Sequence, residues 1–92
     1  MTASEPSQRQ RELLGVVDSA QRAAGVLAAR HRGDTRDAAD LLASFDDDRS
    51  LASGSLLLAE LALGLYHRET DRPMDELVHE LCVHMESSVW SG

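Results

Sequence analysis

Apolar residues recur along the chain at the three- to four-residue spacing that is typical of amphipathic α-helices. The first helix is predicted to begin near Ser7, a candidate N-cap, and to end near Gly33, which suits the position after a helix. Its apolar side becomes small toward the end, so a partner helix can approach closely there. That side consists of Leu13, Val16, Val17, Ala20, Ala24 and Leu27, with Ala23 and Ala28 adding to its small part.

Two further amphipathic segments have clear start signals. Asp34 is a candidate N-cap for a short second helix, whose apolar side is Ala38, Leu41, Leu42 and Phe45. Pro73 suits the first turn of a last helix, because proline lacks the N–H that this turn leaves unpaired. The last helix is predicted to bury one stripe, which consists of Met74, Leu77, Val78, Leu81 and Met85.

The third segment, near residues 50–68, is apolar almost all round and follows a run of three aspartates that favours a helix start. Such a helix is typical of the centre of a bundle, where neighbours pack against several of its sides. Glu60 interrupts the apolar run, which is shorter than the ~20 residues that cross a membrane, so no membrane association is expected. One narrow stripe is small or polar, and we interpret it as a solvent edge or a contact with another chain. It consists of Ser53, Glu60, Gly64 and His67.

Composition supports a helical core. Hydrophobic residues make up 42% of the 92 residues and aromatic residues only 3%, so the core must consist of Leu, Val and Ala. Such side chains suit packed helices better than a sheet, which favours β-branched and aromatic residues. We therefore predict an all-α fold: a compact, four-helix bundle-like single domain over residues 7–90, with the apolar helix near 50–68 at its centre. Residues 1–6 are predicted to be a flexible N-terminus.

Charge and cysteine content narrow the possible partners. The formal net charge of −7 argues against nucleic-acid binding, which relies on a basic surface. A single cysteine, Cys82, allows no internal disulfide, and the first twelve residues contain no apolar secretory core, so a cytoplasmic location is expected. The chain contains no Lys, Asn or Ile, whose codons are A/T-rich, which indicates a high-GC and plausibly actinobacterial genome.

The segment HELCVHM, residues 79–85, combines potential metal ligands. The zinc-protease pattern needs two histidines four residues apart on one helix face. His79 and His84 are five apart and diverge by roughly 140° on a helix, so they cannot hold one ion together. Cys82 and His79 would supply two ligands, fewer than a structural zinc site needs. We expect no metal site and no cofactor, and the roles of His31, His67, His79 and His84 stay open.

The segment GSLLLAEL, residues 54–61, resembles the attachment site of acyl and peptidyl carrier proteins. That family is acidic, near this length and built of four helices, and it carries its prosthetic arm on a serine in Asp-Ser-Leu at a helix start, with Glu-Leu following. The resemblance implies that Ser55 would be the attachment site, with Glu60 and Leu61 at the family's spacing. Gly54 stands where the family has aspartate.

No nucleophile with a base, phosphate-binding loop or paired carboxylates is evident, so an enzyme is not expected. By elimination, the sequence predicts a small helical accessory or regulatory protein that acts by protein–protein contact, with carrier function as the alternative. The partner is another protein or a second copy in a homodimer. The predicted interaction surface joins the stripe described above to exposed apolar residues; its members are Ser53, Glu60, Gly64, His67, Val26, Val83 and Trp90.

Overall fold

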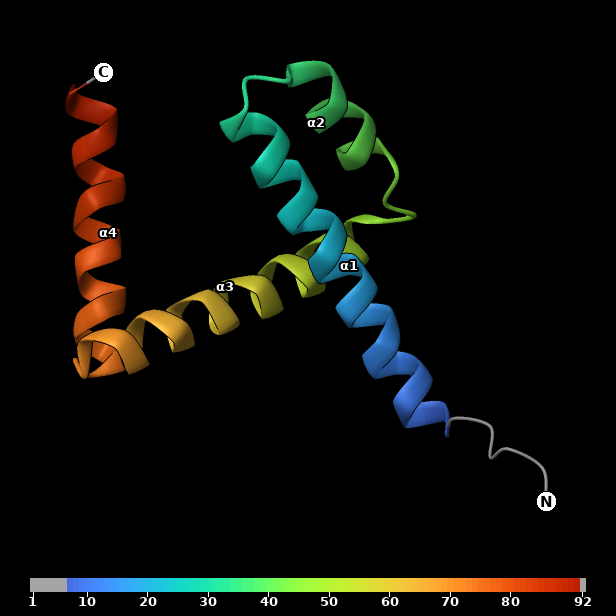
Figure 1. Cartoon of the computed structure of the whole chain (residues 1–92), viewed down its shortest axis with the longest axis horizontal. Helices are drawn as coiled ribbons and strands as arrows, with labels where there is room; N and C mark the ends of the chain where they lie inside the picture. The colour runs from blue at the N-terminus through green and yellow to red at the C-terminus, as the bar shows by residue number, and fades with distance from the viewer. Residues whose placement is uncertain (1–6, 92) are drawn as a thin grey trace. The chain divides into compact units, whose positions relative to one another are not determined.

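The computed structural model describes residues 7–91, which form four α-helices and no strand (Figure 1). This confirms the predicted all-α class, and the helices pack against one another as in helix-bundle proteins. The predicted flexible segment 1–6 lies outside the described residues. The helices are α1 (Gln8–His31), α2 (Thr35–Ala43), α3 (Asp48–Thr70) and α4 (Met74–Ser91).

The helix boundaries follow from local capping chemistry. Ser7 and Gln10 form a capping box at the start of α1, in which each side chain bonds the other residue's backbone N–H. The carboxylates of Asp34 and Asp47 accept hydrogen bonds from backbone N–H groups in the first turns of α2 and α3. Gly33, with φ of 80°, takes the left-handed conformation between α1 and α2. These positions confirm the predicted N-caps at Ser7 and Asp34.

The chain divides into two compact units, Met1–Leu58 and Ala59–Gly92. The boundary falls inside α3, so unit 1 holds α1, α2 and the beginning of α3, and unit 2 holds the rest of α3 and α4. The single helical domain over residues 7–90 stays a prediction.

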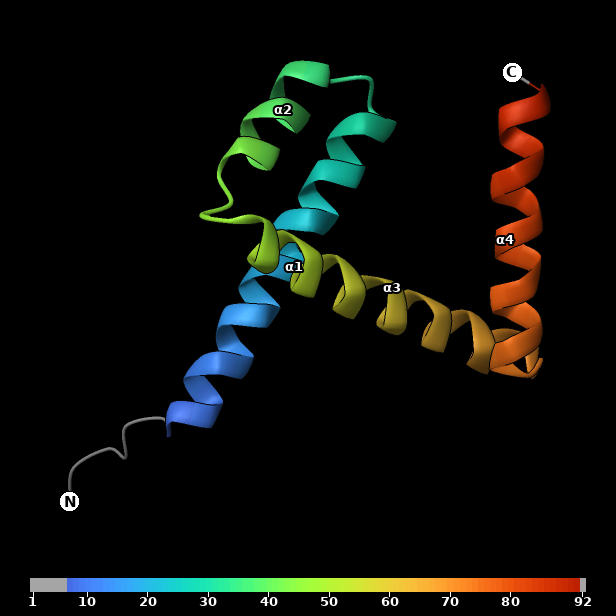
Figure 2. The same cartoon turned by 180° about the vertical axis from the view of Figure 1, so that it is seen from behind.

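The core of unit 1 lies between α1 and α2, which run side by side in both views (Figures 1 and 2). Val26 and Ala29 of α1 pack with Ala38 of α2, and Leu41 closes the cluster. Val26 is only 8% exposed, so the prediction that it belongs to an exposed surface is wrong. The physical reason is that α2 folds back over the side of α1 that carries Val26, and burial of one valine stabilises a fold by about 1.5–3 kcal/mol.

A second contact in unit 1 brings α1 and α3 unusually close. Gly54 is the buried residue of α3, and a Cβ atom placed on it would lie 2.5 Å from the Ser19 backbone carbon of α1. A change of side-chain rotamer could not relieve this overlap, because the obstructing atoms include the Ser19 backbone. The neighbouring Ala20 and Ala23 are buried as well. The small residues in the middle of α1 therefore permit a close helix approach, as the sequence predicts for this side of the helix.

Unit 2 is a helical corner. Asp71, with φ of 53°, adopts the left-handed conformation after α3, and its N–H donates to the His67 carbonyl at 2.8 Å. Leu77 of α4 packs into the angle of the corner and is 2% exposed. The rest of the stripe predicted to be buried on α4 is exposed, so that prediction is wrong for Met74, Val78, Leu81 and Met85. Every residue from 81 to 90 is exposed, because within unit 2 the last part of α3 covers only the beginning of α4.

The apolar helix α3 is less covered than its sequence predicts. Its large side chains Leu56, Leu61 and Leu65 are each more than half exposed, and neither unit supplies neighbours on several sides of the helix. Among residues 7–91, no helix is both long and apolar enough to cross a membrane.

Candidate functional site

The most distinctive surface of unit 2 is a groove between α3 and α4. It has a volume of about 240 Å³ and is lined by Leu63, Tyr66, Leu77, Glu80, Leu81 and His84. Leu77 closes its floor, whereas Leu81 and Tyr66 are each 46% exposed. The groove therefore has an apolar interior and a polar rim, an arrangement that is typical of surfaces that bind other molecules.

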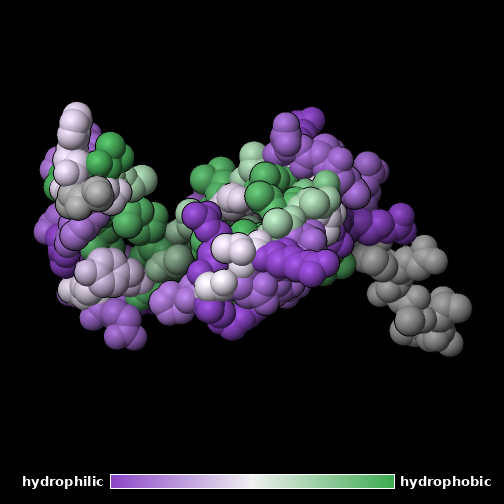
Figure 3. Space-filling view, turned by 90° about the horizontal axis from the view of Figure 1, so that it is seen from above, coloured by the Kyte–Doolittle hydropathy of each residue, from purple (hydrophilic) through white to green (hydrophobic). Residues whose placement is uncertain are grey.

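The apolar surface continues from the groove along α4. In unit 2, ten large apolar side chains are between 38% and 88% exposed: Leu61, Leu65, Tyr66, Met74, Val78, Leu81, Val83, Met85, Val89 and Trp90. The space-filling view shows hydrophobic surface over α4 beside hydrophilic atoms (Figure 3). Single exposed apolar residues are ordinary, but a run of them along one helix side marks an interaction surface.

The residues of α4 from Met74 to Val89 define what we call the α4 face. Its members, spaced by three to four residues, are Met74, Leu77, Val78, Leu81, Met85 and Val89. At 100° per residue they span roughly 120° of the helix, the width of an amphipathic stripe. Val83 and Trp90 lie on the opposite side of α4, roughly 160–180° from Leu81 on a helical wheel. Both are exposed as the sequence predicts, but they do not belong to the α4 face.

An arginine at the corner fixes the rim of the groove. Arg72 donates to the Glu76 carboxylate at 2.8 and 3.1 Å, and its other terminal nitrogen lies 2.5 Å from Glu80 Oε2. These two carboxylates raise the pKa of Arg72 above its usual value, Glu76 contributing most. The second oxygen of Glu80 lies 4.0 Å from His84 Nε2. Arg72 thus connects the loop before α4 to the first two turns of that helix and holds the Glu80 side chain in place.

Most of the net negative charge of the chain lies in unit 2. Residues 59–92 carry a formal net charge of −5, against −2 for residues 1–58. The acidic residues of unit 2 are Glu60, Glu69, Asp71, Asp75, Glu76, Glu80 and Glu86, against Arg68 and Arg72. The sequence of α4 itself, Met74–Ser91, contains four carboxylates and no lysine or arginine.

The stripe predicted on α3 is divided between the two units. Ser53 is half-buried in unit 1, where it lines a second groove beside α1. Glu60 is exposed in unit 2, and Gly64 is half-buried. His67 is half-buried at the corner, where its Nδ1 contacts the Arg72 carbonyl oxygen. His67 therefore stabilises the turn between α3 and α4.

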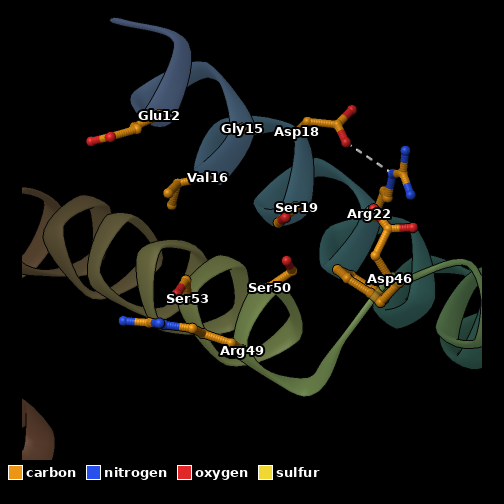
Figure 4. Close-up of a pocket in the computed structure, with 11 residues that line it drawn as sticks. Glu12, Gly15, Val16, Asp18, Ser19, Arg22, Asp46, Arg49, Ser50 and Ser53 are labelled. Atoms are coloured by element: carbon orange, nitrogen blue, oxygen red, sulfur yellow. Dashed lines mark ion pairs between the residues drawn. The ribbon is translucent and has the colours of Figure 1, made fainter. Parts of the chain in front are cut away.

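The groove in unit 1 encloses about 400 Å³ between α1 and the beginning of α3 (Figure 4). Arg22 pairs with Asp18 at 3.0 Å and also donates to the Ser44 carbonyl oxygen at 3.0 Å. Ser50 and Ser53 lie on the α1 side of α3 in the close-up, and no histidine or cysteine lines this groove. The carboxylates of Glu12, Asp18 and Asp46 line the groove instead, and Asp18 is paired with Arg22.

The serine implied by the carrier resemblance lies inside a helix. Ser55 is the eighth residue of α3 and is exposed. The carrier family places its attachment serine at a helix start, so the position of Ser55 gives that alternative no support.

Potential metal ligands are scattered. Among the described residues, no group of three or more His, Cys, Asp or Glu side chains could hold a metal ion. His84 lines the α3–α4 groove, whereas His79 is exposed elsewhere on α4, as expected from their five-residue spacing.

Comparison with protein-family models, with curated proteins and with solved structures finds no match for this chain.

The sequence predictions missed the α3–α4 groove, including Leu63, Tyr66 and Leu81 as its accessible lining. One signal was available: separate charge counts for the two halves of the chain would have marked the acidic second half.

Proposed function

We propose that this protein is a small, non-catalytic interaction module that binds another protein through the α4 face and the adjoining α3–α4 groove. The observation that carries the proposal is the row of exposed large apolar side chains on α4, which unit 2 leaves uncovered. When a partner removes such a hydrophobic surface from water, the burial favours binding by about 25 cal/mol per Å² of apolar area.

The mode of binding we propose is recognition of one helix face by another helix. Met74, Leu81, Met85 and Val89 form a ridge along α4 that can pack into the groove between side chains of a partner helix. The expected setting is the cytoplasm of a high-GC, plausibly actinobacterial, cell, on the compositional grounds given above. The partner is a second copy of the chain or a different protein.

A photo-crosslinker attached to Cys82 tests this proposal directly. Cys82 is the single cysteine, is exposed and lies on α4, so a benzophenone maleimide labels one defined site. In extracts of the producing cells, ultraviolet light should yield a discrete adduct with another protein. The matched control carries Cys82→Ser with Gln21→Cys, which moves the label to an exposed position on α1. The same adducts from both positions, or none from Cys82, would contradict the proposal.

Light scattering after size exclusion identifies the partner class. A dimer at high micromolar concentration that Leu81→Glu converts to monomer would identify a second copy as the partner. A monomer would leave a different protein as the partner.

A further inference from the structure

The α4 face has acidic side chains along both of its edges. On a helical wheel, Glu80 lies beyond one edge of the face, and Asp75 and Glu86 lie beyond the other. Glu76 lies farther round, on the side opposite the face. Arg72 engages Glu76 and Glu80, and it is one of only two arginines in residues 59–92. A partner that covers the face therefore brings its own flanking residues close to carboxylates on either side.

This charge pattern disfavours a second copy as the partner. Two α4 faces placed against each other would bring together two units that each carry a formal net charge of −5. Like charges placed opposite each other at an interface cost several kcal/mol, whereas complementary charges speed association and select the partner.

We infer that the α3–α4 groove and the α4 face bind an amphipathic helix whose apolar stripe is flanked by lysine or arginine residues. The inference rests on the function proposed above and specifies its partner. From Met74 to Val89 the α4 face is roughly 22 Å long at 1.5 Å per residue, so it matches about four turns of a partner helix. The apolar stripe of that helix covers Leu81 and Met85, and its basic residues reach Asp75, Glu80 and Glu86.

Two synthetic peptides test the inference against the full-length protein. Both are 18 residues long with leucine at the same four helical positions; one has lysine and arginine at the flanking positions and the other has glutamate. Fluorescence anisotropy of the labelled peptides should show the basic peptide binding at least tenfold more tightly. Raising the salt concentration from 50 to 500 mM should reduce that preference, because exposed charges are screened. Equal or tighter binding of the acidic peptide overturns the inference.

Variants separate a docked helix from simple attraction between opposite charges. Leu81→Glu should weaken binding of the basic peptide at least tenfold, although it adds a negative charge that would otherwise strengthen binding. The matched control is Leu14→Glu in α1, which makes the same change at an exposed leucine of unit 1 and should leave the affinity unchanged. Circular dichroism confirms that both variants fold. Equal affinities in the native protein and Leu81→Glu overturn the inference.

The two proposals fail in different ways. If Cys82 crosslinks to a partner but the basic peptide has no advantage, the interaction function stands and the partner chemistry is wrong. If the basic peptide binds at the α4 face but Cys82 forms no adduct in extracts, the groove has the inferred preference and the cellular function is wrong.

Discussion

The two units of this protein differ in how far the apolar sides of their helices are covered. In unit 1, α1 meets its neighbours through small residues, and Ala29 and Gly54 lie at contacts so close that little space remains. In unit 2, α4 carries larger apolar residues, and Leu77 is the buried side chain among its described residues. Small side chains let two helices of the same chain pack closely against each other. A stripe of large apolar side chains stabilises a structure only when another surface covers it.

Gly54 is the position at which unit 1 should be most sensitive. We expect Gly54→Ala to cost about 3 kcal/mol of unfolding free energy, because the added methyl group would overlap the Ser19 backbone. The control is Gly64→Ala in the same helix, where an added Cβ meets nothing within 4 Å. Alanine there should stabilise the protein by about 0.5–1 kcal/mol. Urea unfolding followed by circular dichroism measures both, and equal effects at the two glycines would contradict the close crossing.

Substitutions at Leu77 and Leu81 compare a buried with a half-exposed leucine of unit 2. Leu77→Ala should cost about 2 kcal/mol, the lower end of the range for buried leucines, because few neighbours surround the corner. Leu81→Ala should cost less than about 1 kcal/mol, since nearly half of that side chain is already exposed. A larger loss at Leu81 than at Leu77 in urea unfolding would show that α4 is covered within the free chain.

The cap of α2 should have a moderate effect. Asp34→Ala removes the hydrogen bond to the Asp37 N–H, at 2.9 Å, and should cost about 1 kcal/mol. Asp34→Asn, which keeps an acceptor oxygen, should recover most of that loss. The thermal midpoints of the two variants provide the comparison, and identical midpoints would show that the cap contributes nothing.

The smallest expected effect concerns pH and the cap of α3. The hydrogen bond from the Ser50 N–H lowers the pKa of Asp47 below its ordinary value of 3.8. The unfolded chain therefore binds this proton more readily than the folded chain, so Asp47 contributes stability above pH about 4 that is lost as the pH falls through its folded pKa. Urea midpoints measured from pH 6 to pH 2.5 should fall less steeply in Asp47→Asn than in the native protein. Parallel profiles would contradict this contribution.

The helices were predictable from the sequence because their start and stop signals are local. Ser7, Asp34 and Gly33 act within a few residues of their own positions, so the pattern defines them without knowledge of the tertiary contacts. Burial was harder to predict. Val26 and Met85 both lie on amphipathic helices, but only Val26 has a neighbouring helix over it. Periodicity identifies an apolar side and does not show whether the chain itself covers it.

The candidate site was harder to predict than the helices. Trp90 and Val83 are exposed as expected, but neither belongs to the α4 face, and Leu81 and Met85, which do, were expected to be buried. The groove at Leu63 and Leu81 depends on the turn at Asp71, whose left-handed backbone sets the direction of α4. Asp71 offers no glycine to signal that conformation, so the sequence pattern alone could not reveal the groove.

Hydrogen–deuterium exchange of the full-length protein, with and without the basic amphipathic peptide, shows where on the protein the peptide docks. We expect the peptide to slow exchange of backbone amides from 74 to 89 and to leave those of α1 and α2 unchanged. Slower exchange in α1 and α2, with no change along α4, would contradict the assignment of the α4 face as the docking surface.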